Sequence, residues 1–221
     1  MSKVLLTSAY CPPIEYFAAI ASEFSLQGES VVPAEVVLEA SENYQKQSYR
    51  NRCTILSSQG PLDLSFPIVH INGTHNGIPI REVLVDYKNN WLLNHKRAIE
   101  SAYYSSAYFE YYKDEFFSIL ERCPERLFDL NLSLLKFFLS KVGISANISF
   151  TDDYFLKYGP DVKDLRNVIT PKRPNAILKD LQLEKPYFQV FSGKYGFVGG
   201  LSIMDLLFNE GPDSILFLKN L

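Results

Sequence analysis

The stretch that decides the fold is KVLLTSAYCPPIEYFAAIASEF, residues 3–24. Its first part, residues 3–10, is a short apolar run typical of a buried β-strand, and the two prolines that follow it mark a turn. The remainder, residues 14–24, carries large apolar residues at helical spacing along one stripe. The next segment, SVVPAEVVLEA, begins as a second strand, so residues 3–33 predict a β-α-β unit.

Outward from this unit, the pattern predicts a hairpin, two further strands and three helices. CTILSSQGPLDLSFPIV reads as two strands around a Ser-Ser-Gln-Gly turn, and REVLVDY (81–87) reads as another short strand. Helical spacing follows in 89–104, 106–121 and 124–143, and ANISF is typical of a strand. The predicted fold class is therefore α/β: a small mixed sheet that starts with a β-α-β unit, a helical middle section and a compact helical C-terminal extension.

The C-terminal part divides into an irregular stretch and a helical end. Residues 152–188 have mixed charge, several prolines and weak periodicity, which predicts a functional or mobile loop. LSIMDLLFNEGP places Ser202 three residues before Asp205, as in a capping box with Asp in place of Glu, and Gly211 ends that helix. We expect one domain over 1–221, with the helices of 201–221 packed on the body.

Composition limits the classes of function. Of the 221 residues 47% are hydrophobic and 21% charged, which is typical of a folded core, and the net charge of −3 argues against a nucleic-acid partner. Any anion site must therefore be local. No stretch approaches the roughly 18 apolar residues that span a bilayer, and the apolar run at the N-terminus is too short for a signal peptide. We expect no transmembrane segment and a cytoplasmic location. Nothing in the composition predicts the oligomeric state.

Metal and cofactor motifs are missing from the sequence. The three cysteines form no Cys-x-x-Cys pair, and the three histidines have no His-x-His or His-x-x-x-His spacing. His70 and His75 share a Gly/Asn-rich stretch but would need a third ligand from elsewhere. GFVGG (196–200) lacks the strand-then-helix context of a dinucleotide fingerprint, and no Walker A string is present. The sequence predicts no metal site and no cofactor.

The segment QSYRNRCTIL, residues 47–56, carries the most suggestive charges. Arg50 and Arg52 are two apart, so in a strand they would point to the same face, with Asn51 on the other face, where it would cap or brace a turn. Two guanidinium groups on one face predict a clamp for a phosphate or carboxylate, because each binds such groups bidentately. The alternative is an internal ion pair with Asp or Glu from a neighbouring element.

Other candidate residues lie in the helices and in the irregular stretch. His95 is the one reasonable general base and Lys96 a second phosphate contact; alternatively, His95 packs at the edge of its helix stripe and Lys96 is solvated. Arg166 and Lys172 are candidates for anion binding, because loops supply ligands that a scaffold positions. For Asp205 and Glu210 we predict structural roles, with Asp205 capping its helix and Glu210 holding the Gly-Pro turn.

Taken in order, these motifs resemble the WbqC-like protein family, found in bacterial cell-surface polysaccharide gene sets. The family's opening His-Gln-Pro would fall on Leu6, Thr7 and Ser8, so that histidine is absent here. The matching positions are the turn at Tyr10 and Pro12, the Arg-Asn-Arg element at 50–52, Trp91 with His95 and Lys96, the aromatic positions Tyr103, Tyr108 and Phe109, DLRNVITPK, and LSIMDLLFNEGP.

The resemblance implies a function in O-antigen-type polysaccharide biosynthesis. The leading hypothesis is a transferase that acts on a phosphorylated or nucleotide-linked sugar, with acyl or aminoacyl transfer to an amino sugar as one compatible reaction. The alternative is a non-catalytic binding or scaffold protein of the same pathway, which the missing histidine favours. The predicted site has His95 as base and, as residues that bind the sugar or another small anion, Tyr10, Arg50, Asn51, Arg52, Lys96, Arg166 and Lys172.

Overall fold

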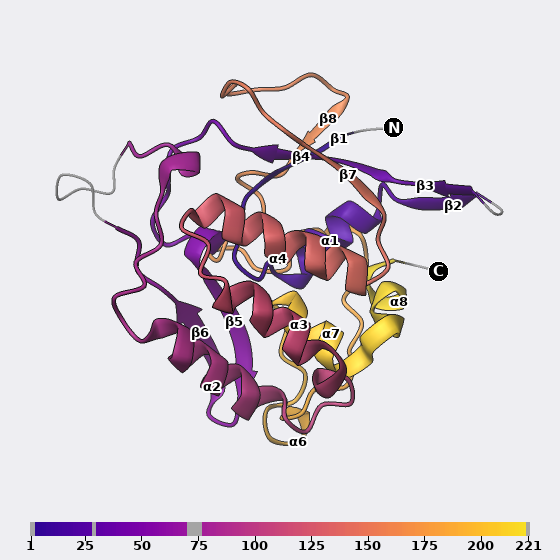
Figure 1. Cartoon of the computed structure of the whole chain (residues 1–221). Helices are drawn as coiled ribbons and strands as arrows, with labels where there is room; N and C mark the ends of the chain where they lie inside the picture. The colour runs from indigo at the N-terminus through magenta and orange to yellow at the C-terminus, as the bar shows by residue number, and fades with distance from the viewer. Residues whose placement is uncertain (1–2, 28–29, 70–76, 220–221) are drawn as a thin grey trace.

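The computed structural model describes residues 3–27, 30–69 and 77–219. The main sheet has four parallel strands in the order β7-β4-β1-β8, and Figure 1 shows it at the top, above the helices. The strands are β1 (Lys3–Thr7), β4 (Ala34–Glu39), β7 (Ala146–Phe150) and β8 (Val162–Asp164). The α/β prediction is confirmed, since helices account for most of the remaining regular structure.

The two faces of the sheet differ because side chains alternate along each strand. One face carries Val4, Leu6, Val36 and Leu38, which are all at most 1% exposed. Helices α1 (Ile14–Ala21) and α4 (Leu127–Lys141) lie on a single side of the sheet in Figure 1, and they contact each other through Phe17 on Phe138. This apolar face is therefore the side of the sheet that packs into the hydrophobic core.

The first crossover differs in extent from the predicted one. Residues after α1 form an antiparallel hairpin, β2 (Ser25–Gln27) with β3 (Ser30–Val32), and the strand that returns parallel to β1 is β4. Pro33 separates β3 from β4 and has no N–H to donate to a ladder, so the chain can leave one sheet and enter another there. The β-α-β unit is present, but it ends at residue 39 rather than at residue 33.

The predicted hairpin is confirmed, whereas the strand predicted over 81–87 is wrong. Strands β5 (Arg52–Ser57) and β6 (Gly60–Ser65) pair antiparallel along their whole length. Residues 81–87 instead pass through a 3₁₀ turn, η2 (Ile80–Glu82), and make only isolated bridges. Among the described residues no neighbouring segment runs beside 81–87 long enough to form a ladder. The segment has a β-prone composition but no strand to pair with.

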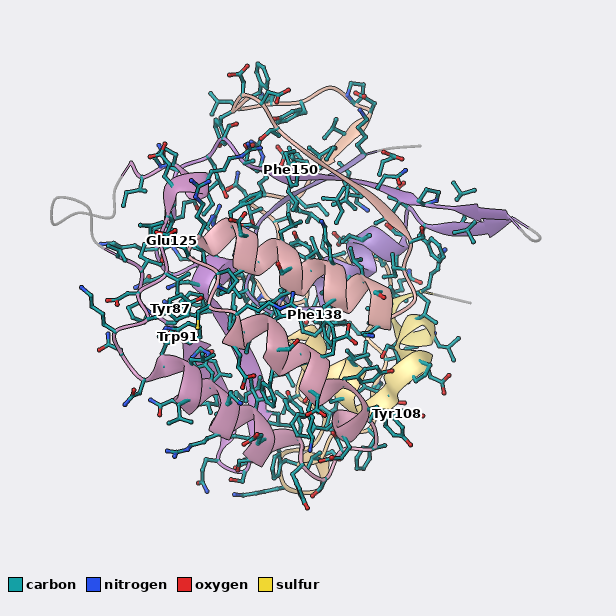
Figure 2. The ribbon with its side chains drawn as sticks, viewed as in Figure 1. Tyr87, Trp91, Tyr108, Glu125, Phe138 and Phe150 are labelled. Carbon is teal, nitrogen blue, oxygen red and sulfur yellow. The ribbon has the colours of Figure 1, made fainter. Side chains whose placement is uncertain are left out.

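Below the sheet lies an aromatic core built by the three predicted middle helices and the C-terminal ones. These are α2 (Trp91–Tyr103), α3 (Phe109–Glu121), α4, α7 (Ile203–Glu210) and α8 (Ser214–Leu218), with η3 (Gly211–Asp213) between the last two. Phe208 of α7 packs edge-on against Tyr103, Phe109 and Phe116. In Figure 2 Trp91 lies beside Tyr87, at 5.5 Å between ring centroids.

The two acidic residues of α7 tie the helix to the preceding segment. The Ser202 hydroxyl accepts from Met204 N–H, as expected for an N-cap. The predicted cap role of Asp205 is wrong, because its carboxylate accepts bonds from Tyr187 and Gln189, and the Ser202 N–H that a capping box would use donates to the carbonyl of Thr54. Glu210 accepts the backbone N–H of Phe188, so its side chain holds that neighbouring segment, and its role at the Gly-Pro turn stays a prediction.

The stretch 152–188 is more ordered than its composition predicts. It contains β8, which joins the main sheet beside β1, and α5 (Ala176–Asp180), and it is followed by α6 (Ser192–Tyr195). These elements are too short to produce a readable period. No helix of the described chain is long and apolar enough to cross a membrane.

Candidate functional site

The carboxyl edge of the parallel sheet contains a cleft at the point where the strand order reverses. The strands β4 and β7 lie on one side of β1, and β8 lies on the other. Open α/β sheets bind ligands outside the carboxyl ends of their strands at such a switch point. A cavity of about 140 Å³ opens there. It is lined by Thr7 at the end of β1, by residues 45–50, and by Arg166, Asn167 and residues 169–172 just after β8.

Four cations line this switch-point cleft: Lys46, Arg50, Arg166 and Lys172. The two lysines are exposed, whereas Arg50 and Arg166 are only 4% and 6% exposed. Three of the four belong to the predicted set, and they come from two segments more than a hundred residues apart. The fold thus brings Arg50, Arg166 and Lys172 together, and it adds Lys46, which sequence reasoning missed.

Arg50 lies outside the strand to which the sequence assigned it. It belongs to the 3₁₀ turn η1 (Tyr49–Asn51), which begins where the Ser48 hydroxyl accepts from Arg50 N–H. Because the strand begins only at Arg52, the prediction that both guanidinium groups share one strand face is wrong. Arg50 instead forms a buried bidentate pair with Glu42, through Nε at 2.9 Å and through Nη2. The Nη1 edge of the guanidinium takes no part in this pair.

Arg166 is held by a second buried network. Its Nε and Nη2 bond both oxygens of Asp164, its Nη1 bonds Glu39 at 2.7 Å, and Nη2 also donates to the carbonyl of Phe155. The side chains of Arg166 and Glu39 are 3% and 0% exposed. Most of the donors of Arg166 are therefore used inside the protein, so this residue shapes the cleft and contributes charge more than free donors.

The arginines shift the pKa values of the carboxylates of Glu42 and Asp164, which lie behind the cleft wall. Burial raises the pKa of Glu42 above its usual range, although Arg50 opposes the shift. Partial burial also acts to raise the pKa of Asp164, but the bonds from Arg166 outweigh it and leave that pKa below its usual value. Neither residue lines the cleft, so cations form its wall and the balancing carboxylates lie behind them. The sequence contains no local signal for these long-range partners.

Arg52 lines a second, more open cleft of about 300 Å³ next to the first. Asn51 lies between the two arginines in sequence, donates from Nδ2 to the carbonyl of Phe66 at 2.6 Å, and leaves its Oδ1 without a partner. Gln47, with a left-handed φ of 55°, and Lys46 line both clefts. The segment around Gln47 thus forms a shared wall between two cationic hollows.

Tyr10 and His95 lie in the aromatic core and line neither cleft. The Nε2–H of His95 donates to the carbonyl of Ser65 at 3.1 Å, since a carbonyl can only accept, and Nδ1 then accepts from the hydroxyl of Tyr10 at 3.0 Å. Burial lowers the pKa of His95 to about 4. Both ring nitrogens are occupied, which is the packing arrangement that the sequence left open as the alternative to a general base.

The remaining candidates lie apart from the clefts or outside the described chain. Lys96 forms an ion pair with Glu121 and lies over the ring of Phe117, on the surface of the helical body. His70 and His75 fall outside the described residues. Over the described ranges, no group of three His, Cys, Asp or Glu side chains is arranged to hold a metal ion.

The arrangement can bind an anion, and its wall contains no obvious proton acceptor. Of the described residues that line the two clefts, none is His, Cys, Asp or Glu. Leu6, where the resemblance places the family's opening histidine, is 1% exposed on the apolar face of the sheet. The built chemistry of the site is therefore electrostatic and hydrogen-bonding recognition by guanidinium, ammonium, hydroxyl and amide groups.

Comparisons with known proteins agree with the resemblance read from the motifs. The uncharacterized protein Rv1507c of Mycobacterium tuberculosis (strain ATCC 25618 / H37Rv) is 29% identical over 243 residues, which cover 99% of this chain and 98% of that protein. No solved structure matches the chain. The model of the WbqC-like protein family matches residues 8–169, a range that contains the candidate residues from Tyr10 to Arg166 and leaves out Lys172 and the C-terminal helices. The chain belongs to the WbqC-like protein family.

Proposed function

We propose that the protein binds a phosphorylated or nucleotide-linked sugar of bacterial surface-polysaccharide biosynthesis, and that the anionic group of this sugar lies in the switch-point cleft. The observation that carries the proposal is the convergence of Lys46, Arg50, Arg166 and Lys172 around one concave site with no carboxylate in its lining. Arginine and lysine bind phosphate oxygens through short charge-assisted hydrogen bonds, which are roughly twice as strong as neutral ones.

The size of the cleft fits such a group. A cavity of about 140 Å³ compares with the roughly 150 Å³ that holds a benzene molecule in an engineered core, so one phosphate or carboxylate group fits without rearrangement. The donors available to such a group are the two exposed lysines and the Nη1 edge of Arg50, which the ion pair between Arg50 and Glu42 does not use. The hydroxyls of Thr7, Ser48 and Thr170 add neutral hydrogen-bonding groups around the rim.

The neighbouring cleft suits a second part of the same ligand. It is lined by Arg52, Asn51 and Tyr44, and shares Lys46 and Gln47 with the first cleft. A ligand with two linked phosphates, or with a phosphate and a polar ring, would place one group on either side of this shared wall. This arrangement favours a nucleotide-linked or otherwise diphosphorylated sugar over a compact anion such as sulfate.

Two kinds of function use such a site. One is a transferase that moves an acyl or aminoacyl group to an amino sugar, with this cleft holding the phosphorylated substrate. The other is a non-catalytic binding or scaffold protein of the same pathway. The second is favoured by the position of His95, whose ring nitrogens are bonded to Tyr10 and Ser65 in the core. Ligand binding is common to both, so it is tested first.

The test is a thermal melt with pyrophosphate and with a panel of nucleotide sugars. A ligand that binds only the native state at about 100 times its Kd adds roughly 2.7 kcal/mol, which for a domain of this size raises Tm by about 5–10 °C. The variant Lys46→Ala/Lys172→Ala should melt like the wild type without ligand and lose most of that gain. Lys136→Ala, an exposed lysine on α4, is the matched control and should retain it. No gain in the wild type, or an equal gain in the double variant, would show that the cleft is not the anion site.

A further inference from the structure

The face of the sheet opposite α1 is covered in an unusual way. The chain leaves β7 at one edge and returns as β8 at the other, in the direction opposite to the β1-to-β4 crossover. Since parallel crossovers are right-handed, this return must pass over the opposite face. Figure 1 shows residues 151–161 arcing over that side of the sheet, with α1 and α4 on the other. A helix usually fills this position, but here the crossover is an irregular strap.

Because a strap is thinner than a helix, a groove of about 380 Å³ remains between it and the sheet. Leu5 and Val37 form the floor, and Ser149 of β7 adds a hydroxyl at one side. Phe155 and Tyr158 of the strap contribute rings to the lining. The lining also includes Lys3, Thr151, Asp152, Asp153 and Val162. The groove is thus distinct from the two cationic clefts, with which it shares no lining residue.

The lining combines an aromatic platform with hydrogen-bonding groups that have spare capacity. Phe155 is 55% exposed, and its ring meets that of Tyr158 edge to face at 5.8 Å. The hydrogen-bonding groups are the exposed carboxylates of Asp152 and Asp153, whereas the Tyr158 hydroxyl is buried and has no hydrogen-bond partner. Phe150, labelled in Figure 2, also borders the groove, but its ring packs edge to face against Phe128 of α4, at 5.7 Å between ring centroids.

This combination matches the chemistry of a saccharide ring. A pyranose has one face of C–H groups, which packs on an exposed aromatic ring, and an edge of hydroxyls, which donate to carboxylates. With the two carboxylates of Asp152 and Asp153 against the one ammonium of Lys3, the groove is a poor site for a phosphate, in contrast to the cationic clefts. A neutral or amino-substituted sugar ring therefore fits this groove better than an anion does.

Arg166 connects the strap to the switch-point cleft. Arg166 lines that cleft, donates to the carbonyl of Phe155, and has its guanidinium carbon 5.0 Å from the centroid of the Tyr158 ring and 4.8 Å from that of Tyr154. The aromatic wall of the groove therefore rests on the same side chain that forms one wall of the cleft.

We propose that the groove under the strap binds a sugar ring of the glycan onto which the pathway's product is built. Its role as an acceptor site rests on the proposed function, but saccharide binding is tested independently of the anion cleft. The first measurement is retention on an array of bacterial surface oligosaccharides. The best-retained glycan is then titrated by calorimetry against the wild type and the variants.

Two variants probe the groove by different means. Phe155→Ala removes the platform and keeps the backbone carbonyl that Arg166 uses, and Asp152→Asn/Asp153→Asn removes the carboxylates from an exposed position. Each should bind the glycan roughly tenfold more weakly or worse, with an unchanged response to pyrophosphate. Tyr111→Ala, which removes an aromatic ring that is 80% exposed on α3, is the matched control and should bind normally.

The outcomes separate the two proposals. Lys46→Ala/Lys172→Ala should lose the pyrophosphate response and keep glycan binding, the reverse of the groove variants. An array that retains no glycan, or groove variants that bind like the wild type, would overturn the saccharide groove whatever the cleft does. A glycan retained by a protein that ignores every phosphorylated ligand would support the groove and refute the anion cleft.

Discussion

At the carboxyl edge of the sheet the buried titratable groups are charged and paired, whereas in the aromatic core they form a neutral hydrogen-bonded chain. Arg50 faces Glu42, and Arg166 faces Glu39 and Asp164. In the core, Tyr10, His95 and the Ser65 carbonyl are joined by hydrogen bonds without a full charge, and burial lowers the pKa of His95 to about 4. Both regions were candidates in the sequence, but Arg50 and Arg166 line the switch-point cleft, whereas Tyr10 and His95 line neither cationic cleft.

The difference shows how burial separates binding residues from packing residues. A buried charge needs an oppositely charged partner. Where the carboxylate bonds only some of the N–H groups of a guanidinium, the other N–H groups can bind a ligand. A buried neutral ring needs one or two hydrogen bonds, after which nothing is left over. The comparison can be tested in each region, because truncation, substitution and pH should change stability and ligand binding differently in the two.

The largest expected effect is on the aromatic core. Removing 201–221 deletes Phe208 and four other buried apolar residues of α7, each worth about 1.5–3 kcal/mol. That sum is comparable to the whole stability of a domain, so we expect insoluble or uncooperatively unfolding protein. The measurement is solubility followed by a thermal melt. Leu216→Ser, a substitution at a half-exposed position in α8, should fold normally. A soluble truncation with a cooperative transition would show that the body is complete without these helices.

The next effect is on the paired arginine. Arg50→Ala leaves Glu42 buried without its partner, which should lower the free energy of unfolding by about 3–5 kcal/mol. Arg52→Ala is the matched control and should cost less than about 1 kcal/mol, because Arg52 is only partly buried and no ion pair is described for it. Adding Glu42→Gln to Arg50→Ala should restore part of the loss. Denaturant unfolding measures all three, and equal effects of the two arginines would contradict the comparison.

The third effect concerns His95. Its folded pKa of about 4 lies below the usual value near 6.5, so the unfolded chain binds the proton more tightly. The stability that this residue contributes is therefore present above pH 6.5 and is lost as pH falls toward 4, by an amount on the order of 3 kcal/mol. Burial raises the pKa of Asp205 to about 6, which acts in the opposite direction over the same range.

Because these two contributions oppose each other, the ring itself should be observed. Nuclear magnetic resonance of the His95 imidazole should show the neutral Nε2–H tautomer down to about pH 5 and a midpoint near 4. A midpoint between 6 and 7 would mean that solvent reaches the ring, and His95 would again be a candidate base.

The smallest effect is expected at Gln47. Its φ of 55° is unfavourable for a side chain with a Cβ, so Gln47→Gly should raise stability by at most about 1 kcal/mol. The same change should weaken pyrophosphate binding, because the wall shared by the two clefts becomes looser. Gln182→Gly is a close control, since Gln182 also has a φ of 55° but lines neither cleft. Equal ligand responses in both variants would remove Gln47 from the site.

The sequence by itself determined the parts of the molecule whose contacts are local. The strand and helix at the N-terminus, the hairpin and the three middle helices follow from periodicity and turn residues, and they appear where predicted. The family assignment also follows from short motifs. Arg166 and Lys172 were found because they lie in the irregular stretch, and loops supply ligands that a scaffold positions.

Only the tertiary structure decided which charges are paired and which residues reach a cavity. One of the two carboxylate partners of Arg166, Glu39, is 127 residues away, and the two meet because β4 and β8 flank β1 in a parallel sheet. The strap over the opposite face, and the groove that it leaves, likewise depend on the order of the strands. Hydrophobic period and turn chemistry extend over a few residues, whereas burial and pairing depend on what lies across the sheet. For that physical reason the roles of Arg50 and His95 could not be read from the sequence.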